Sequence, residues 1–378
     1  MRILWNRKTR DLCIKIMQAL PVQQGRVMCV CWGGEQYDCS PRAIVEKMEE
    51  MGLTHGAEKK FEVSFAFFHP ENFLTDLPIG VEAVTIGSYQ YFKRLSTAQF
   101  IIANTRFGGG MFWPMPKRKG QYYIQTMHGG HGIKHVEFDV NLPEAYLKLV
   151  DEDAKRTDIM PSESDYQNRL FRSAYHYYGD ILNTGLPRND IFFRPAPDKL
   201  HKQKSYVIYT PTFRSNGRRD VFGFDTDRVV GALEQRFGGE WYVMISSHPN
   251  MRSYYHELYD FSHPRMIDVG REDLHPLLRM SEALITDYSS AEMDFSLMNR
   301  PVFQLCKDRA DYDRGFYIQP EELPFPYAET DDQLVNNILS FDAEKYAVDL
   351  ETFNRERIGL HETGHASEDM IRWMLDRR

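Results

Sequence analysis

Short apolar segments that alternate with amphipathic ones constrain this fold more than any other feature of the sequence. Strand-like runs are expected at residues 27–32, 62–68, 81–86, 100–103, 122–127, 206–209, 242–246, 283–286 and 301–305. Helix-like segments between them are expected at residues 43–51, 91–97, 227–236 and 274–280. Apolar strands alternating with helices are typical of parallel sheets joined by crossovers, and these runs suffice for two sheets. The sequence therefore predicts an α/β fold.

A polar stretch divides the pattern near its middle. Residues 194–204 (RPAPDKLHKQK) are rich in proline and lysine and offer little to bury. The length of 378 residues also suits two domains of ordinary size. We expect two Rossmann-like domains facing each other across a cleft. The predicted division is an amphipathic N-terminal helix at 1–25, domains at 26–195 and 196–340, and C-terminal helices at 341–378 that pack back toward the first domain.

Charge, hydropathy and cysteine content narrow the classes of function. The formal net charge is −8, from 46 basic and 54 acidic residues, which excludes nucleic-acid binding by bulk positive charge. No run approaches the ~20 apolar residues of a membrane-spanning helix, and the N-terminus lacks the pattern of a secretory signal. Five cysteines without a CxxC pair indicate buried thiols. These features predict a cytoplasmic protein.

The first twenty residues combine five basic residues with an apolar stripe. On a helix Trp5, Leu12, Ile16 and Leu20 fall near one face, and the basic residues lie mostly off it. This pattern suits a helix lying on anionic lipid. An N-terminal helix docked on the first domain is the other interpretation, and both hold if different edges of the helix make the two contacts.

Polar and glycine-rich clusters follow several predicted strands. Ligands of open parallel sheets bind at the carboxyl ends of the strands, so these clusters are candidate sites. The first is 126-TMHGGHGIKH-135. Its glycines, Gly129 and Gly130 among them, let a ligand approach the backbone closely, and His128 can exchange a proton near neutral pH. A glycine-rich turn with surface histidines is the alternative.

Two further clusters follow strands of the second domain. In 209-YTPTFR-214, Thr212 and Arg214 offer a hydroxyl and a guanidinium fork suited to phosphate oxygens. In 246-SSHP-249, His248 can donate a hydrogen bond to an anionic group. Each is weak evidence alone, because proline, threonine and single histidines end many strands.

The fourth cluster, 286-TDYSSAEMD-294, passes from a buried strand into a helical pattern. Ser289 and Ser290 are expected at the helix N-terminus, where backbone N–H groups favour an anion such as phosphate. Asp294 is expected one turn further on the same face. The competing interpretation is that the serines only cap the helix.

Two apparent metal signals are rejected. The segment 361-HETGH-365 fits HExxH, but Gly364 weakens the helix that such a zinc site needs and no third ligand is apparent. Asp151-Glu152-Asp153 has the DxD spacing that often holds a divalent ion against a nucleotide diphosphate, but we expect it in a helical, solvent-facing context. We therefore expect no metal and no cofactor, with positive and hydrogen-bonding side chains stabilising the phosphates.

The order of these motifs resembles the CDP-glycerol glycerophosphotransferases, which build teichoic acids and related capsule polymers. The resemblance runs from about residue 26 to the C-terminus and is strongest in GxPRND and TDYSS in that order. It is carried by 34-GxxYxxxPRAI-44, His128-Gly129 with Lys134, 185-GLPRND-190, 211-PTFR-214, His248-Pro249, 285-ITDYSS-290 and 314-RGFY-317.

The resemblance implies a GT-B fold and phosphoryl transfer with release of CMP. His128 would be the general base that deprotonates an acceptor hydroxyl, and His248 would act at the pyrophosphate of CDP-glycerol. The other positions that match donor binding are Arg188, Pro211, Thr212, Ser289, Ser290 and Asp294. A lipid-linked or oligomeric acceptor and the inner face of the bacterial cell membrane are the implied partners.

Two departures from the family pattern affect these assignments. Members typically have Trp-His-Gly-Thr-Pro-Leu-Lys, whereas this chain has one more residue and no Thr-Pro between His128 and Lys134. Ser246 stands where a basic residue is common, so we expect Arg214 or Lys134 to meet one pyrophosphate charge. The altered loop predicts a different acceptor or polyol.

Other functions fit parts of the pattern. CDP-ribitol or another CDP-polyol would serve the same reaction, since no residue separates a three-carbon from a five-carbon chain. A nucleotide-sugar 2-epimerase shares a two-domain architecture and a pyrophosphate site, but needs no acceptor. A silent polymer-binding module is disfavoured, because both candidate histidines are present.

Overall fold

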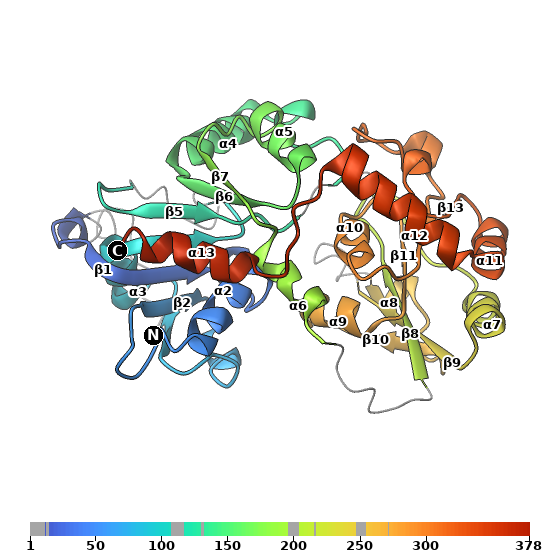
Figure 1. Ribbon diagram of the computed structural model, residues 1–378, viewed down its shortest axis with the longest axis horizontal. Coiled ribbons are helices and arrows are strands. Elements are labelled where there is room, and N and C mark those ends of the chain that lie inside the picture. The colour runs from blue at the N-terminus through green and yellow to red at the C-terminus, as the bar shows by residue number, and fades with distance from the viewer. Residues whose placement is uncertain are drawn as a thin grey trace. The chain divides into compact units, whose positions relative to one another are not determined.

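The computed structural model describes residues 12, 15–106, 117–129, 132–195, 204–214, 217–246, 255–270 and 272–378. The chain divides into two compact units (Figure 1). The N-terminal unit comprises residues 1–128, 141–190 and 361–378, and the C-terminal unit comprises residues 129–140 and 191–360.

A seven-stranded parallel sheet forms the centre of the N-terminal unit, in the order β3-β2-β1-β4-β5-β6-β7. Its strands are β1 (Gln23–Val30), β2 (Glu62–Phe67), β3 (Val81–Thr85), β4 (Ala98–Ala103), β5 (Tyr122–Gln125), β6 (Ile159–Ser162) and β7 (Asp180–Asn183). The side chains of β1 alternate between two apolar cores: Val27 and Cys29 join one, Met28 and Val30 the other. The sheet is therefore buried on both faces.

Helices cover both faces of this sheet. They are α2 (Cys39–Glu50), α3 (Tyr89–Thr97), α4 (Glu144–Arg156), α5 (Asp165–Ser173) and α13 (Ala366–Leu375). Helices α2 and α13 contribute to the core that contains Val27, so the last helix of the chain packs beside the first helix of the sheet (Figure 1). Helix α3 packs on the opposite face. Ser88 and Ser164 cap α3 and α5 by accepting backbone N–H bonds.

The C-terminal unit contains a six-stranded parallel sheet in the order β10-β9-β8-β11-β12-β13. Its strands are β8 (Lys204–Thr210), β9 (Glu240–Ile245), β10 (Met266–Asp268), β11 (Ala283–Thr286), β12 (Val302–Leu305) and β13 (Tyr327–Ala328). Its helices are α7 (Thr226–Phe237), α8 (Tyr255–Leu258), α9 (Leu274–Met280), α10 (Ala291–Ser296), α11 (Asp331–Leu339) and α12 (Ala343–Thr352). The short helix α6 (Asp190–Phe193) spans the boundary between the units.

The predicted α/β class with two parallel sheets is confirmed. Strands β6, β7, β10 and β13 were not anticipated. Pro161 interrupts β6, polar and exposed residues form both ends of β7, and β10 and β13 have only three and two residues. The predicted boundary near residue 195 lies close to the change of unit at Asp190. Two segments group differently from the predicted division: residues 129–140 belong to the C-terminal unit, and so does the part of the tail up to Leu360.

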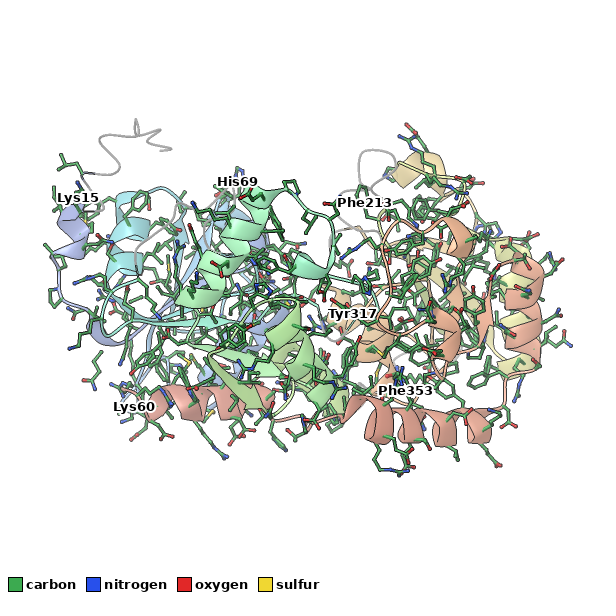
Figure 2. All side chains as sticks on the ribbon, turned by 90° about the horizontal axis from the view of Figure 1, so that it is seen from above. Lys15, Lys60, His69, Phe213, Tyr317 and Phe353 are labelled. Carbon is green, nitrogen blue, oxygen red and sulfur yellow. The ribbon has the colours of Figure 1, made fainter. Side chains whose placement is uncertain are left out.

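Most of the predicted N-terminal helix lies outside the described residues. In its described part, Met17 is buried in the core beside α3, whereas Leu12, Ile16 and Leu20 are exposed. Lys15 is also exposed and points away from the ribbon in Figure 2. This short segment therefore docks through one side and leaves an apolar stripe on another. Among the described helices, none has the length and apolar character needed to span a membrane.

Candidate functional site

His128 stands at the carboxyl end of β5, beside the end of β4. Thr126 N–H donates to the Ala103 carbonyl at 2.8 Å, and His128 Nδ1 lies 3.0 Å from the Asn104 carbonyl oxygen. A carbonyl can only accept a hydrogen bond, so Nδ1 carries the proton and the neutral ring has its lone pair on Nε2. The backbone of β4 therefore sets His128 in the tautomer that a general base requires.

Trp32 and Asn104 complete the surroundings of His128. The Trp32 ring packs against the imidazole with centroids 4.5 Å apart. The backbone N–H of Trp32 donates to Asn104 Oδ1 at 2.8 Å, and Asn104 Nδ2 lies 3.3 Å from Cys31 Sγ. Sequence inspection missed both residues, although Trp32 ends one predicted strand and Asn104 directly follows another. The glycine pair after Trp32 was the one available sign that this turn is unusual.

The environment lowers the pKa of His128 below its ordinary value. Loss of solvent around the ring is the main cause, and the positive charges of Arg188 and Arg106 act in the same direction. The hydrogen bond to Asn104 opposes them. The residue keeps an exposed side, so the ring remains accessible to a substrate. His128 is consequently neutral at physiological pH, as a base must be.

Arg188 lies in the turn η4 (Pro187–Asn189), within the predicted GxPRND motif. The residue is 3% exposed, and its turn packs against α2. Its charge lowers the pKa of His128 and also acts to lower that of the Cys39 thiol, which burial raises to about 11. The guanidinium therefore contributes to the electrostatic environment of His128.

In the C-terminal unit, Asp287 joins the turns that follow β8 and β11. Its Oδ1 accepts the N–H groups of Thr212 at 2.9 Å and Tyr288 at 2.6 Å. One residue earlier, Thr286 Oγ1 donates to the Thr210 carbonyl at 2.7 Å. The predicted 209–214 and 286–294 clusters are thus held together by their own side chains.

Arg214 has a structural role in this arrangement. Its guanidinium makes two hydrogen bonds to Asp308, at 2.6 and 2.9 Å, and an ion pair with Asp287 at 2.8 Å. It also donates to the Thr212 carbonyl at 2.6 Å, and its side chain is 2% exposed. Burial opposes its charge, but Asp287 and Asp308 outweigh burial and raise its pKa. The structure therefore does not present Arg214 as the predicted phosphate ligand, because protein groups occupy its fork.

Pro211 and Thr212 lie on the turn that Asp287 holds. Pro211 is buried, and Thr212 is partly buried. The Thr212 hydroxyl is buried and has no hydrogen-bond partner among the described residues. A buried hydroxyl without a partner is costly, so this one is a candidate ligand-binding group.

The two serines of TDYSS are partly exposed and lie beside the glycine-rich loop. Ser289 Oγ accepts the Ala291 N–H at 3.3 Å, which makes it a capping residue of α10. A Cβ placed on Gly129 would lie 3.5 Å from Ser290 Oγ, and one on Gly132 would lie 3.6 Å from Ser290 Cβ. The loop glycines therefore pass directly over Ser290, which makes no side-chain capping bond.

Lys134 is fixed by pairing of its loop with the RGFY segment. It forms an antiparallel bridge with Phe316, flanked by hydrogen bonds from His135 N–H to the Gly315 carbonyl and from Tyr317 N–H to the Ile133 carbonyl, both 2.8 Å. Tyr317, labelled in Figure 2, packs its ring at a tilt against His135, with centroids 4.5 Å apart. Burial lowers the pKa of Lys134 to about 8, helped by Arg314 and Arg214 and opposed by Asp287 and Glu292. The loop thus holds Lys134 where charges of both signs influence its pKa.

The remaining predicted residues have different positions. Asp294 is 4% exposed in α10, with its carboxylate 3.8 Å from His275 Nε2. Ser246 directly follows β9 and is partly exposed, and its N–H donates to the Tyr209 carbonyl at 3.0 Å. His248 and Gly130 lie outside the described residues. Their predicted roles stay predictions.

The HETGH segment makes contacts within the N-terminal unit. His361 Nε2 lies 2.9 Å from Asp165 Oδ1, and Glu362 Oε1 accepts the Leu186 N–H at 3.0 Å. His365 precedes α13 as its N-cap residue, so the two histidines do not share a helical face. No cluster of three or more metal-ligating side chains occurs in the described ranges.

Comparison with known proteins identifies the family. The model of the CDP-Glycerol:Poly(glycerophosphate) glycerophosphotransferase family matches residues 12–375. The chain belongs to this family.

Three members show how the chain relates to the rest of the glycerophosphotransferase family. A teichoic acid glycerol-phosphate transferase of Staphylococcus aureus is 27% identical over 384 residues, covering 94% of this chain and 93% of that protein. A teichoic acid ribitol-phosphate primase of Bacillus spizizenii is 28% identical over 389 residues, covering 94% and 92%. A teichoic acid poly(glycerol phosphate) polymerase of Bacillus subtilis is 25% identical over 396 residues and covers 96% of this chain. The chain spans 50% of that polymerase's length.

Solved structures support the fold of this family member. The wall teichoic acid polymerase TagF matches with a TM-score of 0.80 and 24% identity, covering 98% of this chain and 94% of that chain. A TagF variant soaked with CDPG matches with a TM-score of 0.81. This similarity confirms the predicted GT-B class. A UDP-GlcNAc 2-epimerase from Methanocaldococcus jannaschii also matches, with a TM-score of 0.51 and 13% identity. The fold alone therefore does not choose between transferase and epimerase, and family membership does.

The buried charge cluster around Arg214 generates a stability prediction. Asp308→Asn removes one of the two carboxylates that neutralise the buried guanidinium, which costs about 3–5 kcal/mol for pairs of this kind. We expect a clearly lower thermal midpoint and a lower urea midpoint, followed by circular dichroism. The matched control is Asp220→Asn, which breaks an exposed pair with Arg218 and should leave both midpoints nearly unchanged, because water screens exposed pairs. Equal midpoints for the two variants would refute the structural role of Arg214.

Proposed function

We propose that this protein transfers glycerol phosphate from CDP-glycerol to a hydroxyl of a lipid-linked or oligomeric acceptor, with release of CMP, in teichoic-acid-like or capsule polymer synthesis. Family membership across residues 12–375 supports the reaction class. The observation that carries the chemistry is the orientation of the His128 imidazole. Its Nδ1 is hydrogen-bonded to the Asn104 carbonyl, so its Nε2 can accept a proton.

The chemical steps follow from these groups. His128 Nε2 takes the proton of the acceptor hydroxyl as that oxygen attacks the β-phosphorus of CDP-glycerol. The new O–P bond forms as the bond to the bridging oxygen of CMP breaks, and the electron pair leaves with CMP. Phosphoryl transfer depends mainly on alignment and charge stabilisation, so neutral His128 and cationic side chains suffice on the protein side.

Several predicted donor-binding residues have a group suited to a phosphate. Thr212 contributes its unpartnered buried hydroxyl, Ser290 the hydroxyl beneath the glycine loop, and Lys134 a positive charge. Arg188 contributes a guanidinium near His128, and Ser289 and His248 retain their predicted roles at the pyrophosphate. We propose that the reaction uses no cofactor or metal, which activity in the presence of EDTA would support.

A ribitol donor is the second candidate. The ribitol-phosphate primase of Bacillus spizizenii matches this chain over nearly its full length, with identity equal to that of the glycerol-phosphate relatives within a few per cent. CMP release measured in parallel with CDP-glycerol and CDP-ribitol decides between them.

We also propose that the protein binds the surface of an anionic membrane, on its cytoplasmic side, through its N-terminal segment. Leu12, Ile16 and Leu20 have exposed side chains at intervals of four residues, with Leu12 and Ile16 in helical conformation and Leu20 in the turn that follows. Met17 anchors the segment to the core, and exposed Lys15 lies beside the stripe. This combination suits a helix that lies in the membrane interface.

Removing the base tests the proposed reaction. Purified enzyme with CDP-glycerol and a glycerol-phosphate oligomer should release CMP, and His128→Ala should lower kcat about 100-fold or more, because a general base contributes 10²–10⁴. The KM for the donor should change little. His69→Ala, at an exposed histidine, is the control. Unchanged turnover in His128→Ala, or CMP release independent of acceptor, would refute the assignment.

The pH profile tests Lys134. Activity should fall at low pH as His128 becomes protonated, at a pH below its ordinary pKa of 6.5. It should fall again as the pH rises through about 8, because Lys134 then loses its charge. Lys134→Arg should move only the alkaline limb to higher pH, since arginine stays protonated.

Kcat/KM measured from pH 5 to 10 gives both limbs of this profile. The control is the exposed Lys155→Arg, which should leave the profile unchanged. An alkaline limb that is the same in Lys134→Arg and wild type would contradict the role of Lys134.

Vesicle binding tests the apolar stripe. Leu12→Asp combined with Ile16→Asp should weaken binding to phosphatidylglycerol vesicles about 100-fold or more, since each side chain buried in lipid contributes about 1.5–3 kcal/mol. Cosedimentation provides the measurement. Val348→Asp, at an exposed apolar residue of α12, is the control and should bind like wild type. Equal binding by all three proteins would rule out this segment as the membrane contact.

A further inference from the structure

We propose that Glu362 is a positioning residue that holds Arg188 in its donor-binding orientation. The inference rests on the proposed function, because it takes Arg188 as a ligand of the donor pyrophosphate. It also gives a role to the HETGH segment, whose resemblance to a zinc motif has no counterpart in the described contacts.

The Glu362 carboxylate makes hydrogen bonds to residues that precede and follow Arg188 in its turn. Oε1 accepts the Leu186 N–H at 3.0 Å and the Asn189 side-chain amide at 2.8 Å. Gly185 has φ +97°, and a Cβ there would overlap the same carboxylate. Only glycine combines this backbone angle with so close an approach. One carboxylate therefore touches residues before and after Arg188.

The turn is also attached to the last helix of the chain. The Asp190 carboxylate accepts the N–H groups of Ala366 at 2.9 Å and Ser367 at 2.8 Å. Ser367 Oγ donates to the Pro187 carbonyl at 3.3 Å. The N-cap residue of α13, His365, makes no side-chain capping bond, so Asp190 serves as the cap from 176 residues away in the sequence.

Helix α13 is a rigid support for these contacts. Its residues Met370, Ile371 and Met374 are fully buried in the core that also contains α2. The segment before the helix is fixed by His361, whose N–H donates to the Glu163 carbonyl at 2.6 Å. Glu362 therefore extends from a segment anchored at both ends.

Arg188 needs this support because a long side chain takes its direction from its backbone. Its turn is a single 3₁₀ turn with no side-chain capping bond of its own. The guanidinium must remain close enough to His128 to influence its pKa. Loss of the Glu362 contacts would let the turn relax and cost the donor a well-aligned, charge-assisted pair of hydrogen bonds.

A double-mutant cycle tests positioning against a purely structural role. The four proteins are wild type, Glu362→Ala, Arg188→Ala and the double variant, and the measurement is the Kd for CDP-glycerol by calorimetry. We expect each single variant to weaken binding about ten-fold or more, the scale of a lost hydrogen bond to a charged group. The double variant should bind no more weakly than Arg188→Ala, because Glu362 acts through Arg188.

Two conservative variants separate positioning from folding. Glu362→Gln keeps a carbonyl oxygen that can accept both hydrogen bonds, so it should restore most of the affinity lost in Glu362→Ala. Asn189→Ala removes the side-chain bonds to Glu362 and Glu163 but leaves the bond from Leu186 N–H to Glu362, so it should weaken donor binding less. It keeps the test decisive if Glu362→Ala does not fold. Glu368→Gln, which breaks a surface pair with Arg372 in α13, should leave the Kd unchanged.

The outcomes distinguish this inference from the proposed function. If Arg188→Ala weakens donor binding but the effects of the two single variants multiply, the positioning role is overturned and the function stands. The same holds if Asn189→Ala and Glu362→Ala both bind CDP-glycerol like wild type and Glu362→Ala merely lowers the thermal midpoint. If CDP-glycerol does not bind the wild-type protein, the proposed function fails and the inference falls with it.

Discussion

The Asp287 carboxylate is the contact on which the C-terminal half of the site depends. It binds the backbone of two turns, after β8 and after β11, and pairs with Arg214 between them. Parallel strands bring such turns to one edge of a sheet but do not fix their separation. The Asp287 carboxylate fixes that separation, because it accepts a backbone N–H group from each turn. The hydroxyls of Thr212 and Ser290 inherit their spacing from this one side chain.

The N-terminal half achieves a similar precision through its backbone. The Asn104 carbonyl determines which nitrogen of His128 carries the proton, where many enzymes use a carboxylate for that purpose. A neutral acceptor does not stabilise the protonated imidazole as a carboxylate would. Loss of solvent, Arg188 and Arg106 lower the pKa of His128 and outweigh the opposing hydrogen bond to Asn104, so the imidazole is a weak base that releases its proton easily.

Most of the fold could be predicted from the sequence, because buried parallel strands are continuous apolar runs. The missed strands β6 and β13 show the limit: Pro161 interrupts the first, and the second has only two residues. Both are specified by the neighbouring strand and not by their own composition. The positions of the polar clusters were also predictable, since the carboxyl ends of strands follow from the alternation.

The roles of individual side chains were less predictable. Arg214 has the residue type and position of a phosphate ligand, but Asp287 and Asp308, which neutralise it, are 73 and 94 residues away in sequence. Trp32 and Asn104 belong to no motif considered, and only their packing against His128 reveals them. Long-range pairing of charges and rings is a property of the folded chain, which a pattern of neighbouring residues does not contain.

The cap that Asp190 provides for α13 has a consequence for how the protein is made. The N-terminal unit is discontinuous, since its last segment, residues 361–378, is synthesised after the whole C-terminal unit. Its sheet can form early, but the turn that carries Arg188 waits for residues 361–378 to leave the ribosome. A chain that lacks this segment would therefore have its candidate base in place while the turn of Arg188 still lacked its contacts with Glu362 and α13. Completion of the N-terminal part of the site thus follows synthesis of the whole C-terminal unit.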